Sequence, residues 1–597
     1  MSQGLDEQEE QEIRSIGSEV FMIIGRLYGL IDGFKWFIFL GNLLCIGFVM
    51  AELHIIDMCR GIANRDDLST ASWASLLGWL LVVLLANRAF GWSQFMVTVY
   101  ATNRAMIKLR TQFFAKLMSL SKSFYDTHKL GWLVARGTGD MNTIYDFLTF
   151  GLMVVFMICS YTGIIAWKLW DVAPSLLAVA AVVIPIGCAV IAWLQKRIRA
   201  RVEELSSQNS RMIAYLAESI RGVRVTQAFA REEKNLSAYM EFNQENVRLS
   251  LKVLKATAIL MPTMDALGIL GIVTVITWGA WMLEHGAMSH GQLITPADLV
   301  ACVLYMNMLL IPIRMLIDIY NMSINAATSA RRVFQVLELQ PEIKDPAEPE
   351  ELPRMKGALS FRQVQFRYKE DGPWILKGID LDIPAGQVVA IVGKTGAGKT
   401  TIAHLAARFH DPQEGQVMVD GRDLRVFRQD DLHAHMGIVL QEGFLFSGTV
   451  LDNIRFRRPE LSRDEVQKLC EGLGTHEAID ALPDSYDTEV MEGGSNLSVG
   501  QRQLISLSRA LAADPKVLIL DEATSAIDVA TEVILERALQ RLVHGRTTII
   551  IAHRLSTIRR AERILVMEQG RIIEDGSDAQ LLALNGEYTK LVQGAAH

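Results

Sequence analysis

The chain has 597 residues, more than one soluble domain ordinarily holds, so two or more domains are expected. Half of its residues are apolar and only 21% are charged, a balance typical of a membrane protein. The formal net charge of -7 and the lack of a basic low-complexity tail exclude a nucleic-acid partner.

The N-terminal residues, MSQGLDEQEEQE, are acidic, so they do not have the pattern of a cleaved signal peptide. The six cysteines include no C-x-x-C pair, and four of them lie in apolar runs. These cysteines are therefore interpreted as small hydrophobic residues and not as a disulfide framework or a zinc site.

Long uncharged runs alternate with basic stretches from residue 33 to residue 322. Six of these runs approach or exceed the ~20 residues that a helix needs to cross a bilayer. They are residues 33–53, 74–99, 144–167, 171–194, 257–283 and 298–322. The pattern predicts a six-helix transmembrane domain over residues 33–325, after an N-terminal cytoplasmic segment with an elbow helix over residues 1–32.

The basic residues are distributed unevenly between the loops. The loop after the second span and the loop after the fourth carry most of them, whereas the opposite side has only Arg60, Arg65 and Lys168. By the positive-inside rule, both long loops and both termini are cytoplasmic. Apolar residues recur at helical spacing in these loops, so the helices are expected to extend below the membrane and to end in short turns.

The segment QPEIKDPAEPEELPRMKG, residues 340–357, contains four prolines and a charge run, which is typical of a linker. The linker is assigned to residues 326–357 and a nucleotide-binding domain to residues 358–597. In that domain LSFRQVQFRY alternates like a strand, VVAIVG reads as a buried strand and TTIAHLAARF opens a helix. Strand, loop and helix in that order predict an α/β fold with a mainly parallel sheet.

The sequence GKTGAGKT stands between that buried strand and that helix and matches the phosphate-loop pattern G-x-x-x-x-G-K-[ST]. Its glycines let backbone N–H groups surround phosphates, and the helix N-terminus adds a favourable field. Lys399 is expected to reach the β- and γ-phosphates of ATP, and the Thr400 hydroxyl to hold Mg²⁺. The residues expected to bind the nucleotide here are Gly393, Thr395, Gly396, Ala397, Gly398, Lys399, Thr400 and Thr401.

Two further strands end in residues suited to phosphoryl transfer. KVLILDE ends in two carboxylates, of which Asp521 is placed to bind Mg²⁺ and Glu522 to take a proton from the attacking water. His553, which follows the strand-like TTIIIAH, is expected near the γ-phosphate. These residues therefore predict phosphoryl transfer from a bound nucleotide to water.

Several motifs together resemble a known family. GKTGAGKT, VLQEGFLFSGTVLDNI, LSVGQ, VLILDEATSAID and IAH occur in the order and spacing of an ATP-binding cassette. With six spans before it, nearly the whole chain resembles an ABC exporter half-transporter of the lipid-flippase or multidrug type. FYDTHKLGWLVARGTGDMNTI and YLAESIRGVRVTQAFAREE resemble the two cytoplasmic coupling loops of that family.

The resemblance implies roles for three more residues. Tyr368 matches the aromatic residue that stacks on adenine. Gln441 matches the glutamine that contacts Mg²⁺ and the attacking water and reports to the membrane domain. Asp528 matches the loop that communicates between two ATP sites.

The stretch LSVGQ resembles the family's signature sequence, which binds ATP held by another cassette. The positions carried over are Ser498, Val499, Gly500 and Gln501, and Val499 replaces the usual glycine. The resemblance therefore implies a dimer in which two cassettes close head-to-tail over two ATP molecules. A homodimer is adequate, because this chain carries every catalytic motif, and a heterodimer with a homologous half-transporter stays open.

Substrate choice depends on the transmembrane domain. Ionisable residues inside spans are functional candidates, here Arg88, Asp265, Arg314 and Asp318. Arg314 and Asp318 could instead pair along one helix, since they are four residues apart. Lipid or lipid-linked cargo, hydrophobic drugs and peptides all stay open. So do two other functions, an importer of exporter-like architecture and an ATP-gated channel.

Overall fold

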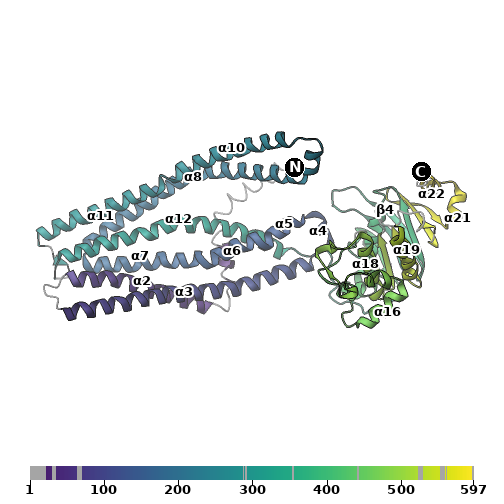
Figure 1. Ribbon diagram of the computed structural model, residues 1–597, viewed down its shortest axis with the longest axis horizontal. Helices are drawn as coiled ribbons and strands as arrows, with labels where there is room; N and C mark the ends of the chain where they lie inside the picture. Colours follow the sequence, from purple (N-terminus) through teal and green to yellow (C-terminus); the bar gives the residue numbers. More distant parts are fainter. Residues whose placement is uncertain are drawn as a thin grey trace. The chain divides into compact units, whose positions relative to one another are not determined.

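The structure is a computed structural model. It describes residues 22–27, 29, 35–63, 70–286, 288–289, 292–352, 355–439, 443–521, 529–551, 558–559 and 561–594. The chain divides into two compact units (Figure 1). The helical unit comprises Met1–Met118 and Leu130–Leu339, and the α/β unit comprises Ser119–Lys129 and Gln340–His597.

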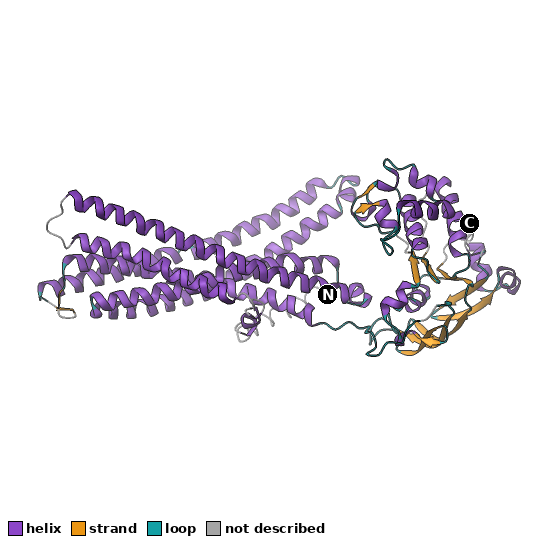
Figure 2. Cartoon of the chain, turned by 90° about the horizontal axis from the view of Figure 1, so that it is seen from below, coloured by secondary structure: helices purple, strands orange, loops and turns teal. Residues whose placement is uncertain are grey.

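Long helices running side by side make up the helical unit (Figures 1 and 2). Its helices are α2 (Lys35–Ala63), α3 (Thr70–Ser119), α5 (Leu130–Ala135), η1 (Arg136–Asp140), α6 (Met141–Asp146), η2 (Phe147–Gly151), α7 (Leu152–Val172), α8 (Pro174–Arg221), α9 (Val223–Ala228), α10 (Glu232–Thr257), α11 (Leu260–Glu284) and α12 (Pro296–Glu338). A short hairpin of β1 (Met288–Ser289) and β2 (Gln292–Leu293) precedes α12.

Among the described residues, four helical stretches are long and apolar enough to cross a membrane. They are Phe39–Ile62, Trp73–Ser119, Leu130–Val172 and Glu232–Glu284. The apolar stretch Pro296–Leu309 at the start of α12 is shorter. The predicted spans fall on α2, α3, α6 to α7, α8, α11 and α12, and their number, six, stays a prediction.

Two helices begin at prolines. Proline has no backbone N–H, and an N–H in the first turn of a helix would have no partner within the helix, so proline is well tolerated there. Pro174 starts α8, and Pro296 starts α12. Before α12, the Thr295 hydroxyl accepts a hydrogen bond from the Asp298 N–H, and the Asp298 carboxylate accepts one from the Thr295 N–H. This capping box satisfies two otherwise free N–H groups.

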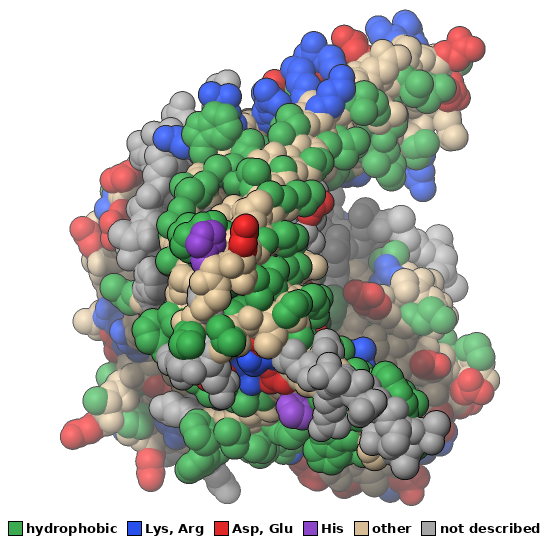
Figure 3. Space-filling model, turned by 90° about the vertical axis from the view of Figure 1, so that its left-hand side faces the viewer, with side chains coloured by type: hydrophobic (Ala, Val, Ile, Leu, Met, Phe, Trp, Pro, Cys, Tyr) green, Lys and Arg blue, Asp and Glu red, His purple; other side chains and the backbone are tan. Residues whose placement is uncertain are grey.

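The helices of the two long loops extend well beyond the length that spans a bilayer, as predicted: α3 has 50 residues and α8 has 48. Helix α9 lies between α8 and α10 in the chain. Apolar side chains are exposed on it and directly after it, since Val225 is 62% and Phe229 is 73% exposed. Seen from the end of the helices, hydrophobic side chains dominate the facing surface, and Lys and Arg gather on the projecting top (Figure 3).

A mainly parallel sheet forms the centre of the α/β unit, as predicted. Its strand order is β14-β13-β5-β12-β11-β8, and only the edge strand β14 runs antiparallel to its neighbour. The strands are β5 (Val388–Gly393), β8 (Met436–Val439), β11 (Val517–Asp521), β12 (Thr547–Ile551), β13 (Arg563–Glu568) and β14 (Arg571–Gly576). Buried apolar runs such as VVAIVG are typical of strands covered on both faces.

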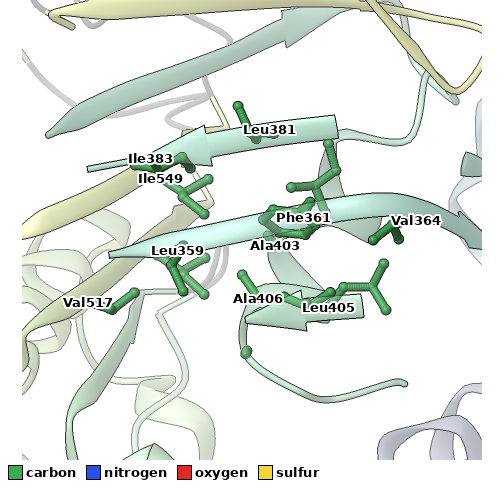
Figure 4. Packing of buried hydrophobic residues seen from close by; sticks show 14 of the residues in the cluster. Leu359, Phe361, Val364, Leu381, Ile383, Ala403, Leu405, Ala406, Val517 and Ile549 are labelled. Carbon is green, nitrogen blue, oxygen red and sulfur yellow. The ribbon is translucent and has the colours of Figure 1, made fainter. Parts of the chain in front are cut away.

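A second, antiparallel sheet has the order β4-β3-β6-β7. Its strands are β3 (Leu359–Phe366), β4 (Leu376–Ile383), β6 (Glu414–Val419) and β7 (Arg422–Asp423). Apolar residues of β3, β4, β11, β12 and α13 (Lys399–Ala406) form one buried cluster, so α13 is packed between the two sheets (Figure 4).

The remaining elements of the α/β unit are short, apart from three helices on the other face of the parallel sheet. That unit also contains α4 (Lys122–Thr127), η3 (Leu424–Val426), α14 (Gln429–Ala434), β9 (Gly448–Thr449), α15 (Val450–Ile454), α16 (Arg463–Leu473), α17 (His476–Asp480), η4 (Ser485–Asp487), β10 (Glu489–Val490), η5 (Glu492–Gly494), α18 (Val499–Ala512), α19 (Val529–Val543), α21 (Asp578–Leu584) and α22 (Glu587–Gly594). Residues of α16, α18 and α19 share a second buried cluster with the parallel sheet.

Candidate functional site: a phosphate loop and a capped signature helix

The loop between β5 and α13 is a backbone cradle that only glycine can form. Gly393, Gly396 and Gly398 have φ angles of 145°, 84° and 102°. A Cβ at Gly393 would lie 2.2 Å from the Met567 carbonyl oxygen, and one at Gly398 would lie 2.7 Å from Leu376 Cδ2. The backbone conformation therefore favours glycine at all three positions, and close packing also requires it at Gly393 and Gly398.

Lys399 begins α13 and lies within this loop. Its side chain is 6% exposed, and Nζ donates hydrogen bonds to the carbonyl oxygens of Gly393 at 2.7 Å and Lys394 at 3.1 Å. Burial lowers the pKa of Lys399, and the nearby Asp521 carboxylate acts in the opposite direction. A cation at a helix N-terminus lined by backbone N–H groups is suited to binding phosphate.

The other residues predicted in this loop occupy two environments. Ala397 and Thr401 are buried, whereas Thr395, Gly396 and Thr400 are exposed at the tip and along the first turn of α13. The Thr400 hydroxyl and the Asp521 carboxylate are oxygen donors of the kind that Mg²⁺ prefers. These residues therefore fit a magnesium–nucleotide complex.

Tyr368 offers an aromatic face beside the loop. Its side chain is 46% exposed, and its hydroxyl lies 3.1 Å from Thr401 Oγ1. The ring meets Phe366 and His410 edge to face, with centroid distances of 4.9 and 5.4 Å. An exposed ring fixed in this way is suited to stacking on a base.

The predicted signature residues form the N-terminus of α18. The Ser498 hydroxyl accepts a hydrogen bond from the Gln501 N–H at 3.2 Å, and the Gln501 side chain accepts one from the Ser498 N–H at 2.9 Å. Ser498 and Val499 are exposed, and Gly500 is buried. This capping box fixes the first turn of α18 with Ser498 at an exposed position.

The chain preceding α18 is held by Arg502, which reaches back from the first turns of that helix. Its Nη1 donates to the carbonyl oxygens of Leu497 at 2.6 Å and Gly494 at 3.1 Å. Gly494 has a φ of 72°, and a Cβ there would lie 2.8 Å from Arg502 Cδ. The signature loop is therefore prearranged by its own contacts.

Four predicted residues, Glu522, His553, Gln441 and Asp528, lie outside the described part of the chain. The strands that lead toward two of them are described. Asp521 of β11 pairs with Ile551 of β12, and Ile551 pairs with Ile391 of β5. Both strands therefore end at the edge of the sheet where β5 enters the phosphate loop.

The predicted candidates in the spans lie on three different helices. The side chains of Arg88 on α3, Asp265 on α11 and Asp318 on α12 are exposed in this chain. Arg314 is on α12, but its side chain lies outside the described part.

Sequence analysis missed a set of polar side chains shared by α2, α7 and α12, here named the outer polar cluster. Its members are Glu52, Asp57, Arg60, Tyr161, Lys168, Asp298 and Tyr305. Lys168 Nζ lies 2.6 Å from Asp57 Oδ2, and the Tyr305 hydroxyl donates to Asp57 Oδ1 at 2.5 Å. Arg60 Nε lies 2.5 Å from Asp298 Oδ1, and the Tyr161 hydroxyl donates to Glu52.

A second missed group surrounds Asp140, which is 6% exposed at the end of η1. Its carboxylate accepts hydrogen bonds from Arg332 at 2.7 Å, Ser329 at 2.9 Å and Arg136 at 3.0 Å. These contacts tie η1 to α12. In the sequence, Asp140 stands out only as an acidic residue in a basic loop, and this pattern does not indicate which residues it contacts.

Comparisons with known proteins agree with this geometry. Residues 54–308 match the family described as ABC transporter transmembrane region, and residues 376–525 match the family described as ABC transporter. The chain is 34% identical to an ATP-dependent lipid A-core flippase of Syntrophus aciditrophicus, over 88% of this chain and 87% of that protein. It is 32% identical to a fatty acid ABC transporter ATP-binding/permease protein of Mycobacterium bovis, over 87% and 80%.

A solved structure supports the same architecture. A bacterial Atm1-family ABC exporter with ATP bound superimposes with a TM-score of 0.77 at 27% sequence identity. The match covers 96% of this chain and 99% of that one.

Proposed function

This chain belongs to the ABC transporter family, as an exporter-type half-transporter that couples ATP hydrolysis to transport, and we propose that its substrate is an amphipathic, lipid-like molecule. It is a multi-pass membrane protein with a cytoplasmic ATPase domain. The transport direction, outward from the cytoplasm, is that of its exporter relatives.

The depth of the charged residues in the spans supports the substrate class. At ~1.5 Å per residue, Arg88, Asp265 and Asp318 lie about 27, 28 and 33 Å along their helices from the outer ends of α3, α11 and α12. The hydrocarbon core of a bilayer is ~30 Å thick. Asp265 and Asp318 therefore stand near its inner boundary, where the head group of an inner-leaflet lipid would lie, and Arg88 lies in the middle part of its predicted span, residues 74–99.

The exposure of these charged side chains indicates where the substrate would bind. A charged side chain that faces lipid tails is costly, so such residues normally face a partner or a polar cavity. In a transporter built from two chains, the exposed faces around Arg88 and Asp318 would line the space between them. An amphipathic cargo would place its polar head against these residues and its tails against the apolar surfaces above. The lipid and fatty acid transport named for two relatives is of this class.

The partner is proposed to be a second copy of the chain. Its phosphate loop and signature helix α18 are both complete, so two identical chains can supply both halves of each ATP site. The exposed Val225 of α9 and the exposed Phe229 directly after it would then dock on the partner's ATPase domain. This assignment explains why α9 carries an apolar surface in a cytoplasmic loop.

In the proposed cycle each side chain has one task. Lys399 holds the β- and γ-phosphates, Tyr368 stacks on adenine, and Ser498 of one chain closes over the ATP of the other. Glu522 takes the proton of the attacking water, and His553 contacts the γ-phosphate. Mg²⁺, held by Thr400, Asp521 and Gln441, would neutralise charge on the phosphates. Asp528 would communicate between the two sites.

A Glu522→Gln variant tests the catalytic assignment. It should bind ATP, form the closed dimer and lose steady-state turnover by about 100-fold or more, because the general base is gone. Turnover at the unaltered rate would refute the role of Glu522.

Stimulation of ATP hydrolysis by amphiphiles tests the substrate class. The purified protein is reconstituted into phosphatidylethanolamine–phosphatidylglycerol vesicles, and the ATPase rate is measured with oleate, with the cation rhodamine 6G and with glucose. Oleate stimulation should require Arg88, and rhodamine stimulation should require Asp318, so Arg88→Gln and Asp318→Asn should each lose one response.

Arg104→Gln is the matched control, because Arg104 is also exposed on α3 but lies about 51 Å from its outer end. This variant should keep both responses. Stimulation by glucose alone, or full responses in the Arg88 and Asp318 variants, would contradict a lipid-like substrate bound at these charges.

A further inference from the structure

A short piece of the first long loop is packed into the α/β unit. Residues Ser119–Lys129, with helix α4, belong to that unit although they precede its main part by more than two hundred positions. The Ser121 hydroxyl accepts a hydrogen bond from the Glu342 N–H at 2.8 Å. Lys122 Nζ lies 2.7 Å from Asp126 Oδ1, so the one acidic side chain of α4 is oriented by a neighbour on the same helix.

Asp126 faces a buried histidine of the α/β unit. His410 is 3% exposed, and its Nε2 lies 3.7 Å from Asp126 Oδ2. Among the described residues, Nε2 has no hydrogen-bond partner at this distance. A buried polar atom without a partner costs free energy, and an approach of about 0.7 Å would give Nε2 an ordinary hydrogen bond to the carboxylate.

The same histidine also contacts the predicted base-stacking residue. The His410 ring meets the Tyr368 ring edge to face at 5.4 Å and also packs against Phe366 at 5.4 Å. The Tyr368 hydroxyl is held near Thr401 on α13. Because protein interiors are close-packed, a shift of the Tyr368 ring when a base packs on its exposed face also shifts the His410 ring.

Burial favours a neutral His410 ring, against the effect of the carboxylates around it. Burial lowers the pKa of His410, an effect that Lys122 adds to and that Glu342, Asp126 and Asp411 oppose. The pKa of the neighbouring His404 falls to about 4, again chiefly through burial. At neutral pH, His410 can therefore donate one N–H hydrogen bond while its buried ring carries no positive charge.

We propose that His410 is a positioning residue that links base stacking at Tyr368 to the orientation of α4 through Asp126. When a base packs on Tyr368, His410 is pressed toward Asp126, and the Nε2–H group donates to that carboxylate. By reciprocity, an α4 held in this orientation favours a nucleotide with a large base. The proposal rests on the proposed role of Tyr368.

Base preference is the measurement that tests this link. The ratio of kcat/KM for ATP to that for CTP is determined for the full-length protein in vesicles, because adenine stacks over a larger area than cytosine. Asp126 is on α4 and faces His410, whose ring contacts Tyr368. Asp126→Asn should nevertheless lower the ATP/CTP ratio about 5-fold, the lower end of ordinary coupling between two sites.

His410→Phe keeps the ring packing on Tyr368 and removes Nε2, so it should lower the ratio to the same extent. The double variant should be no worse than either single variant, because the two residues act in one link. Lys129→Gln, an exposed charge change in the same loop, is the control and should leave the ratio unchanged.

Tyr368→Ala separates the two hypotheses. Loss of ATP preference in Tyr368→Ala together with an unchanged ratio in Asp126→Asn would overturn the link and leave the role of Tyr368 standing. An unchanged ratio in Tyr368→Ala would instead overturn the base-stacking assignment itself. Melting temperatures measured for each variant exclude loss of fold as the cause, and Asp126→Asn changes no buried side chain.

Discussion

The phosphate loop and the outer polar cluster both hold charged side chains in place, but the interacting residues are close in sequence in the loop and far apart in sequence in the cluster. Lys399 donates to two carbonyl oxygens that precede it by five and six residues. Lys168 and Tyr305 instead meet Asp57 across 111 and 248 residues of sequence. A site whose partners are contiguous can be read from a motif, whereas a site assembled from three helices requires the fold.

The largest effect is expected from a substitution in the phosphate loop, whose partners are contiguous in sequence. Lys399→Ala removes the cation from the glycine loop, and the loss of one charged donor to a transferring group typically costs about 100-fold or more in rate. ATP turnover by the reconstituted protein should fall accordingly. Lys394→Ala, an exposed lysine of the same loop, should stay near the unaltered rate. If the two variants behaved alike, the site would not depend on the buried ammonium group.

An intermediate effect is expected at the outer polar cluster. Lys168→Met leaves Asp57 without its cation, and breaking a fully buried ion pair costs ~3–5 kcal/mol. The Lys168 and Asp57 side chains are 18% and 23% exposed, so about 2 kcal/mol is expected after discounting for solvent screening. The melting temperature in detergent should fall.

The double variant Asp57→Leu/Lys168→Met should recover part of that loss, because no charge is then left unpaired. Lys590→Gln, which opens an exposed pair with Glu587, should change the melting temperature little. Equal melting temperatures for Lys168→Met and Lys590→Gln would show that the cluster contributes no more than a surface pair.

The smallest effect is expected at the signature helix. Val499 is 38% exposed at the first position of α18, directly after the N-cap residue Ser498. Val499→Gly should lower the KM for ATP about 2-fold by clearing this surface, at a helix cost below about 1 kcal/mol. Ser498→Ala should have the larger effect, since it also removes the helix cap. A Val499→Gly variant with a large loss of turnover would be contrary to this expectation.

Sequence patterns predicted the fold well wherever local signals decide it. The run VVAIVG, the glycine loop and the helix after Gly398 each have a strong local preference, and the parallel sheet follows from their order. The two long cytoplasmic extensions were also predicted, because helical spacing continues past the spans in α3 and α8.

What the sequence could not supply were contacts between distant segments. Asp140 lies 189 and 192 residues from Ser329 and Arg332, and no local pattern pairs them. The packing of α4 into the α/β unit is of the same kind. The roles of Glu522, His553, Gln441 and Asp528 stay predictions, because those residues lie outside the described part of the chain.

The placement of α4 also matters for how the ATPase domain is produced in isolation. A recombinant fragment that begins at residue 340 would encode the α/β unit without one of its own pieces. Ser121 would no longer cap the backbone at Glu342, and His410 would face water in place of Asp126. Rates measured on such a fragment would describe a surface that the intact transporter does not have. Grafting residues 119–129 onto the fragment through a flexible linker would restore that surface.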